Sequence, residues 1–249
     1  MRAVGVHCFA GGMIMGVRQA GFELEASYEP LGFGVETQRE RLGVDVRAIG
    51  VDDVDDWPLP GFTPDLVIGN PRCGGFGSLG ANSAGADARG GECRQSRDAE
   101  QLVQFGLRTR ARAIVLESVQ TILQGSNRVF VDRLVRDLLV PEGYHVWHVL
   151  MSTAWLGNPQ RRRRYFLLAM RDRRCPDFES PSPPERAVVV GDVLGELVAR
   201  DARPGRLLRS GAEYDEDVYN DYGEEVERLY CHLQQGDTVN SLLHRHGAR

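Results

Sequence analysis

Short apolar segments alternate with helix-like segments over residues 3–170, and this alternation sharply limits the folds that the chain can adopt. Apolar runs such as residues 66–68 and 113–116 are too short for buried helices and predict buried strands. Helix-like segments end at glycines, among them Gly21 and Gly43, which are common C-terminal stops. Strands that are joined through helices form mainly parallel sheets with helices on both faces, so the sequence predicts an α/β fold. The predicted strands cover residues 3–9, 22–28, 46–49, 66–68, 113–116, 144–151 and 165–170, and the predicted helices cover residues 13–20, 33–42, 98–109 and 129–139.

The composition is that of an ordinary globular protein. Hydrophobic residues make up 42% and charged residues 26% of the 249 positions, so the chain can bury a substantial core. It has no apolar run of about 18 residues, and its start lacks the pattern of a signal peptide, so we expect no membrane span. Its 5 cysteines are scattered without a CxxC pair, which argues against a metal site and favours a reducing, cytoplasmic setting. The net charge of -5 gives no global attraction to nucleic acids, so a polyanionic partner would have to meet a local basic patch.

One cysteine follows the predicted strand at residues 66–68. A turn at residues 69–71 ends that strand, and Cys73 stands at its C-terminal edge, where α/β sheets bind ligands. Such a thiol acts as a nucleophile when its pKa is lowered, and Arg72 is adjacent. The alternative is a buried structural cysteine, against which the flanking turn residues argue. Residues 74–97 are rich in glycine, lack periodicity and predict a long mobile loop of the kind that forms lids.

Three further clusters stand at the ends of predicted strands. The turn Phe9-Ala10-Gly11-Gly12 would let a nucleotide-like cofactor approach the backbone, and a plain tight turn has the same composition. Glu29, at the end of the second strand, is placed to bind ribose hydroxyls or is an ordinary exposed acid. Glu117 ends a buried strand. The arginines at residues 161–164 are typical of a solvated surface or a phosphate patch, but they lead into the strand at residues 165–170, so we expect at least one to point toward the functional edge.

The order and spacing of these motifs over residues 1–198 resemble the cytosine-C5 DNA methyltransferase family. The first turn, with Ala20-Gly21-Phe22, is similar to the family's first cofactor motif, and Asn70-Pro71-Arg72-Cys73 is similar to its Pro-Pro-Cys loop. Glu117-Ser118-Val119 resembles its Glu-Asn-Val motif, and residues 160–164 match its Gln-x-Arg-x-Arg motif. No single motif decides the resemblance, but the ordered series is specific.

The resemblance implies a Rossmann-like methyltransferase fold that binds S-adenosyl-L-methionine, with no metal. Cys73 would be the nucleophile and Glu117 would bind the N3 and N4 edge of cytosine, while Arg162 and Arg164 would steady the pyrimidine and the catalytic loop. The implied substrate-binding residues are Arg72, Phe76, Ser118 and Gln160, and the implied cofactor-binding residues are Phe9, Ala10, Gly11, Gly12, Glu29, Pro30, Asp52, Asp53, Asn70 and Pro71.

The implied reaction is the transfer of a methyl group to C5 of cytosine in DNA through a covalent bond between Cys73 and C6 of the ring. The cytosine would be flipped out of the duplex, and the glycine-rich loop would close over it. The resemblance thus implies a DNA (cytosine-5-)-methyltransferase of the kind that serves in restriction-modification.

Several positions depart from the family's pattern. The glycine turn is shorter, Arg72 replaces a proline, Ser118 replaces an asparagine, and Gly74 and Gly77 replace Gln and Ser around Phe76. The family's target-recognition domain and its last two motifs are not found, which a fragment, a second polypeptide or a minimal form would explain.

Two other functions stay open at this point. One is a related pyrimidine C5-modifying enzyme that uses a different donor, or acts on a free nucleotide or RNA. The other is a non-catalytic, cofactor-binding regulatory subunit of a split methyltransferase. The joint presence of Cys73, Glu117, Gln160, Arg162 and Arg164 favours an enzyme.

The composition changes after Met170, which predicts two regions. A proline-rich connector begins at Cys175, and acidic residues gather between Glu213 and Glu225. We therefore expect a catalytic and cofactor-binding α/β domain over residues 1–172. Residues 173–249 would form the connector and a partial or truncated C-terminal region.

Overall fold

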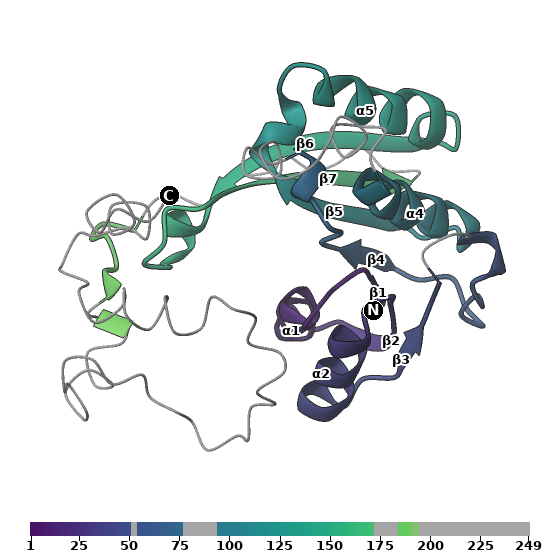
Figure 1. The fold of residues 1–249 in the computed structure, drawn as a ribbon, viewed down its shortest axis with the longest axis horizontal. Helices are drawn as coiled ribbons and strands as arrows, with labels where there is room; N and C mark the ends of the chain where they lie inside the picture. The colour runs from purple at the N-terminus through teal and green to yellow at the C-terminus, as the bar shows by residue number, and fades with distance from the viewer. Residues whose placement is uncertain (51–53, 77–93, 172–183, 191, 194–249) are drawn as a thin grey trace, which may run out of the picture. The chain divides into compact units, whose positions relative to one another are not determined.

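The structure, a computed structural model, describes residues 1–50, 54–76, 94–171, 184–190 and 192–193 (Figure 1). Within these residues a 7-stranded sheet has the order β3-β2-β1-β4-β5-β7-β6. The five strands from β3 to β5 pair in parallel, and β7 runs antiparallel to both β5 and β6. The prediction of a mainly parallel sheet is confirmed. The strands are β1 (Arg2–Val6), β2 (Glu23–Glu29), β3 (Val46–Ala48), β4 (Leu66–Gly69), β5 (Ala113–Val119), β6 (Tyr144–Ser152) and β7 (Arg163–Arg171).

Helices cover both faces of this sheet, and β1 shows why. Alternate side chains of a strand point to opposite faces. Val4 and Val6 belong to the large core that α4 and α5 cover, whereas Ala3 packs with Val17 of α1. All these side chains are buried, so the strand is apolar along its length, as expected for a central parallel strand. The helices are α1 (Gly12–Gln19), α2 (Gly32–Leu42), α4 (Arg94–Arg108) and α5 (Asn127–Arg133).

Some predictions fall outside the described residues. These are Asp52, Asp53, most of the loop predicted at residues 74–97, and nearly all of the region after Arg171. The chain divides into the units Met1–Val189 and Val190–Arg249, and every strand and helix named above belongs to the first. In the described part of the chain, no helix is long and apolar enough to cross a membrane.

Element bounds differ from the prediction where long-range pairing decides them. β5 continues to Val119, past the predicted end at Leu116, because its last residues pair with β7. α4 begins at Arg94 and not at Asp98. The predicted helix at residues 129–139 begins as α5 and continues as a π-helical segment, Leu134–Leu139 (η6). The extension of β5 matters most, because it places Glu117 inside the sheet.

Gly69 ends β4 where two elements press on the backbone, which generates a stability prediction. A methyl group at this position would overlap the backbone oxygen of Val6 and lie 2.5 Å from Cδ1 of Leu102. We expect Gly69→Ala to lower the free energy of unfolding by at least about 3 kcal/mol, because the neighbouring strand cannot move aside. Urea unfolding followed by circular dichroism measures this. Gly16→Ala is the control, because Gly16 lies in α1 with open space around it, and it should raise stability by about 0.5–1 kcal/mol. A Gly69→Ala protein as stable as the wild type would contradict the packing described.

Candidate active site

Cys73 stands just beyond β4, on a turn that is anchored in the core. A single 3₁₀ turn, Gly74–Phe76 (η2), follows directly after it. The Phe76 N–H donates to the carbonyl of Cys73 at 3.0 Å. The ring of Phe76 is 3% exposed and packs on Phe130 of α5, with centroids 5.3 Å apart. Phe76 therefore anchors the loop, while Cys73 remains half-buried at the edge of the core.

Glu117 on β5 lies beside Arg164 on the neighbouring antiparallel strand. The strand register pairs Val119 with Arg164. Oε1 of Glu117 and Nε of Arg164 are 2.6 Å apart, and both side chains are only 15% exposed. Ser118, between Glu117 and Val119, is buried. Antiparallel pairing thus brings two charged groups together at the edge of the sheet where β4 delivers Cys73.

Arg162 follows the turn between β6 and β7, and Thr153 braces that turn. The Thr153 N–H donates to the carbonyl of Arg162 at 2.9 Å, and the Thr153 hydroxyl accepts the N–H of Arg162 at 3.1 Å. The same hydroxyl donates to the carbonyl of Gln160. The guanidinium of Arg162 is exposed, yet its charge acts on both Cys73 and Glu117. The two arginines of the motif therefore serve the same group of side chains.

The thiol of Cys73 and the carboxyl group of Glu117 share one electrostatic environment. Burial raises the pKa of Cys73, and the negative charge of Glu117 raises it further. Arg162 and hydrogen bonds from backbone N–H groups, including that of Val119, oppose this rise in the pKa. Burial also raises the pKa of Glu117 to about 7, against the charge of Arg162. The ion pair with Arg164 works in the same direction as Arg162 and favours the carboxylate. Burial therefore favours the protonated form of Glu117, while the two arginines favour its carboxylate.

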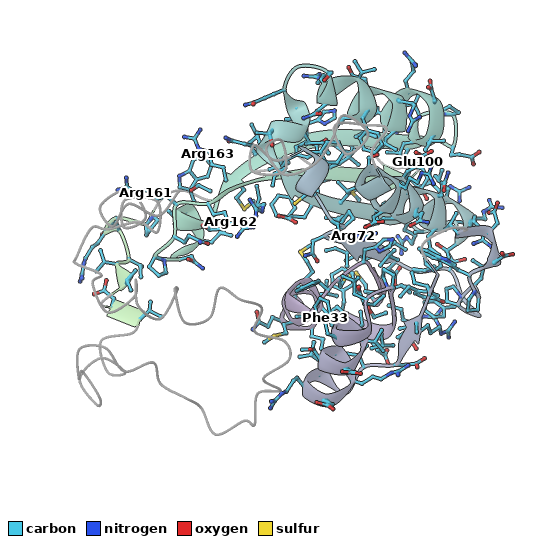
Figure 2. All side chains as sticks on the ribbon, viewed as in Figure 1. Phe33, Arg72, Glu100, Arg161, Arg162 and Arg163 are labelled. Carbon is cyan, nitrogen blue, oxygen red and sulfur yellow. The ribbon has the colours of Figure 1, made fainter. Side chains whose placement is uncertain are left out.

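Arg72, which stands next to Cys73 and is labelled in Figure 2, is bound by Asp98 of α4. Nε of Arg72 lies 2.5 Å from Oδ2 of Asp98, and Nη2 of Arg72 lies 2.9 Å from Oδ1 of Asp98. Asp98 is 1% exposed. From the sequence we expected Arg72 to be the cation that activates the adjacent thiol. Its charge instead neutralises Asp98, and Arg162 is the cation that lowers the pKa of Cys73.

A buried histidine lies in the same region, under the loop. Nε2 of His7 and Oε1 of Gln101 are 3.2 Å apart, and both residues are buried. Burial lowers the pKa of His7 to about 4, against the charge of Asp98, so the ring is neutral at physiological pH. The backbone carbonyl of His7 accepts the N–H of Asn70 at 3.3 Å. The start of the loop that carries Cys73 is thus held to the end of β1 as well as to α4.

The glycine turn after β1 is held by side chains from β2 and α2. The Glu29 carboxylate accepts the N–H of Phe9 at 2.7 Å and that of Leu31 at 3.1 Å, and the amide of Gln38 donates to the carbonyl of Phe9 at 2.5 Å. Phe9 has φ 52° and Gly11 has φ 91°, both in the left-handed region. Glu29 is 2% exposed, and burial raises its pKa against the two N–H groups. Glu29 therefore fixes the turn, a function that the sequence did not indicate.

The surface beside this turn has the chemistry that a nucleoside cofactor would need. The rings of Phe9 and Phe33 meet edge to face with centroids 4.7 Å apart, and the two residues are 44% and 53% exposed. The space at Gly12 is open, and the buried Oδ1 of Asn70 has no hydrogen-bond partner in the described part of the chain. Exposed aromatic rings, an open glycine backbone and an unpaired acceptor fit a flat base and a polar tail.

A separate hollow of about 510 Å³ lies between α4 and the 3₁₀ turn Val54–Asp56 (η1). Its walls include Asp55, Glu100 and Arg108. None of the predicted site residues that the structure describes lines this hollow. The candidate active site is therefore the edge of the sheet described above, and not this hollow.

Comparison with known proteins identifies the family. The family model "C-5 cytosine-specific DNA methylase" matches residues 1–244. The chain belongs to this family. It is 23% identical over 206 residues to the type II methyltransferase M.HgiDI of Herpetosiphon aurantiacus, covering 81% of this chain and 63% of that one. It is 29% identical over 208 residues to M.NaeI of Lentzea aerocolonigenes, covering 79% of this chain and 46% of the relative. The chain thus spans about half to two thirds of the length of these type II methyltransferase relatives.

Solved structures confirm the Rossmann-like methyltransferase fold that the motifs implied. A DNA modification methyltransferase encoded within an Escherichia coli prophage superposes with a TM-score of 0.60 at 18% identity, covering 78% of this chain and 54% of that one. The Entamoeba histolytica methyltransferase EhMeth gives a TM-score of 0.57 at 12% identity, covering 75% of this chain and 57% of that one. At these identities the likeness concerns the fold alone. The comparisons lend no support to a second polypeptide as a partner of this chain.

The structure brings most of the predicted site residues to one edge of the sheet. Cys73 follows β4 and Glu117 lies near the end of the neighbouring β5, while Arg164 lies on β7 beside it and Arg162 directly precedes β7. The predicted cofactor residues that are described also lie at strand ends, and their roles remain predictions. Those that follow β1 are Phe9, Ala10, Gly11 and Gly12, those at the end of β2 are Glu29 and Pro30, and those after β4 are Asn70 and Pro71.

Sequence reasoning missed Asp98, Thr153 and Phe33. Asp98 lay at the start of a predicted helix, where an acid is common and gives no sign of a partner. Thr153 and Phe33 act through contacts that depend on the fold. An arginine where the family has a proline was the one available signal, because a new charge beside a buried loop needs a counter-ion.

The coupling between Cys73 and Glu117 predicts how the thiol titrates. Glu117→Gln removes a negative charge that raises the pKa of Cys73, so the pH profile of Cys73 alkylation should shift to lower pH. Arg162→Gln removes a positive charge and should shift the profile to higher pH. Iodoacetamide labelling at a series of pH values, with mass spectrometry of the peptide that contains Cys73, measures both shifts. Unchanged or reversed profiles in both variants would show that the three side chains are not neighbours.

The ion pair between Arg72 and Asp98 predicts an unequal cost of removing its two partners. Arg72→Ala leaves Asp98 buried without a counter-ion and should cost about 3 kcal/mol, at the low end for buried pairs because the Arg72 side chain is 34% exposed. Asp98→Asn should cost less, about 1–2 kcal/mol, because the freed guanidinium can reach water. Urea unfolding measures both. Arg112→Ala, which breaks an exposed pair with Asp65, is the control and should cost less than about 1 kcal/mol. Equal, negligible costs for all three variants would rule out a loop anchor at Asp98.

Proposed function

We propose that this chain is the catalytic part of a DNA (cytosine-5-)-methyltransferase that acts through a covalent bond between Cys73 and C6 of the cytosine. The observation that supports it best is the convergence of a half-buried thiol, a carboxyl group that titrates near neutrality and two arginines at one edge of the sheet. The names of the type II methyltransferase relatives support the substrate and the reaction.

The first step is activation of the pyrimidine. The Cys73 thiolate adds to C6. The electron pair of the C5–C6 double bond shifts toward C4, and negative charge develops on N3. Glu117 in its protonated form donates its proton to N3, so that no full negative charge develops on the base. Arg162 stabilises the thiolate before it attacks, and Arg164 holds Glu117 at the end of β5.

The methyl group is then added at C5. When S-adenosyl-L-methionine is bound, its sulfonium supplies the methyl group that the activated C5 takes up. The residues that would hold the cofactor are the turn at Phe9 and Gly12, the ring of Phe33 and the amide of Asn70. Glu29 supports that turn from below, through the two N–H groups that its carboxylate accepts.

The last step restores the enzyme. A base removes the proton from C5, and its bonding electrons re-form the C5–C6 double bond and expel Cys73 as a thiolate. The proton on N3 returns to Glu117. Because duplex DNA buries C6 in the stack, we propose that the cytosine is flipped into the site before the thiolate attacks.

Trapping tests this proposal directly. A 5-fluorocytosine duplex with S-adenosyl-L-methionine should form an adduct that survives denaturing electrophoresis, because fluorine at C5 cannot leave as the proton does. Cys73→Ser should form no adduct, and Glu117→Gln should form it about 10²-fold more slowly. Cys8→Ala is the matched control, because Cys8 is a buried cysteine in the core beside α1 and should not affect trapping.

Mass spectrometry of nucleosides identifies the product. DNA from cells that express the chain should contain 5-methylcytosine when Cys73 is present and none in the Cys73→Ser strain. Modified cytosine in RNA but not in DNA would point to the alternative substrate. Binding of the cofactor without any adduct or product would show a non-catalytic, regulatory protein and would overturn the proposal.

A further inference from the structure

The four consecutive arginines at residues 161–164 form two groups on the β6–β7 hairpin. Arg162 and Arg164 act on Cys73 and Glu117, as described above. Arg161 and Arg163 lie on the other side of the hairpin from Arg162, and all three are exposed (Figure 2). The alternation follows from extended backbone, in which successive side chains point to opposite sides.

Arg161 and Arg163 are exposed cations at the end of the β6–β7 hairpin. In the part of the chain that the structure describes, no carboxylate pairs with either guanidinium. Several other surface arginines are paired, as Arg128 is with Asp132 and Arg133 is with Glu100. Two unpaired guanidinium groups beside each other on a chain of net charge -5 form a local basic patch of the kind that meets a polyanion.

The hairpin presents this patch on a firm base. β6 and β7 pair through to Ser152 and Arg163, and the hydrogen bonds of Thr153 to residues 160 and 162 continue the bracing beyond the last pair. The residues that follow Thr153 include two exposed apolar side chains, Trp155 at 37% and Leu156 at 59%. Exposed arginines and an exposed aromatic ring on one hairpin are residue types that suit a nucleic-acid backbone and its bases.

We propose that Arg161 and Arg163 bind backbone phosphates of the DNA strand that carries the target cytosine. The inference rests on the proposed function. Arg162 lies between them in sequence and acts at Cys73, so one hairpin would carry both the phosphate contacts and the cation that acts on the thiol. The guanidinium groups would fix the position of the duplex without reading its sequence.

Salt dependence of duplex binding tests this inference. The slope of log K against log[salt] is negative, and each lost phosphate contact reduces its magnitude by about 0.9. The double variant Arg161→Gln/Arg163→Gln should therefore reduce this magnitude by roughly 2. The ratio of wild-type to variant affinity should then shrink by roughly tenfold between about 50 mM and 200 mM salt. Fluorescence anisotropy of a labelled duplex, with the full chain, measures the slope. Each single variant should lose about half of the effect.

The matched control removes the same charge from the opposite edge of the sheet. Arg41 ends α2 and Arg110 lies just before β5, and neither forms an ion pair in the described residues. Arg41→Gln/Arg110→Gln should leave the salt slope unchanged. An equal fall in the slope for both double variants would show an effect of net charge alone and would overturn the inference, as would an unchanged slope in Arg161→Gln/Arg163→Gln.

Trapping separates this inference from the proposed function. At saturating duplex and low salt, Arg161→Gln/Arg163→Gln should form as much 5-fluorocytosine adduct as the wild type. A wild type that binds DNA with the expected slope but forms no adduct would overturn the covalent mechanism and leave the phosphate contacts standing. A wild type that does not bind duplex DNA at all would overturn both.

Discussion

The pairing of β5 with the antiparallel strand β7 is the constraint on which the candidate site depends. Residues on these two strands are far apart in sequence, and only the register that sets Val119 opposite Arg164 brings Glu117 within 2.6 Å of an arginine. A shift of this register by one residue would turn Arg164 to the other face of the sheet. The buried side chains of Tyr165, Leu167 and Ala169 forbid that shift, because they would then have to face the opposite layer. The apolar core therefore sets the geometry of the charged groups.

The loop that carries Cys73 is held in a different way, by an ion pair and by aromatic packing. The family resemblance led us to expect the stiffness of a second proline, and this chain has Arg72 instead. A guanidinium held by two hydrogen bonds to the buried carboxylate of Asp98 restricts the loop on one side of Cys73, and the buried ring of Phe76 restricts it on the other. The loop thus gains from two side chains the restraint that a proline supplies through its ring.

The sequence was sufficient to predict which strand ends and turns carry the candidate residues but not how their side chains are paired. Apolar runs and glycines located the strands and turns, because these signals are local and periodic. The pairing of Arg72 with Asp98 and of Glu29 with the N–H groups of Phe9 and Leu31 depends on which strands and helices become neighbours. No local pattern encodes such contacts. Arg72 was therefore expected to act on the thiol beside it, whereas the fold gives that role to Arg162.

Burial disfavours the charged forms of both Cys73 and Glu117, and this shared effect links the two groups. Cys73 and Glu117 each have a raised pKa because each loses water, and an ionised Glu117 makes the thiolate still less favourable. Arg162 is the one charge that lowers the pKa of both. Its position is set by the hairpin that also carries Arg161 and Arg163, so in the proposed complex the contacts that fix DNA on the hairpin would fix Arg162 as well. Without this cation the thiol would ionise still less readily, so its reactivity toward a bound base would depend on the position of the hairpin.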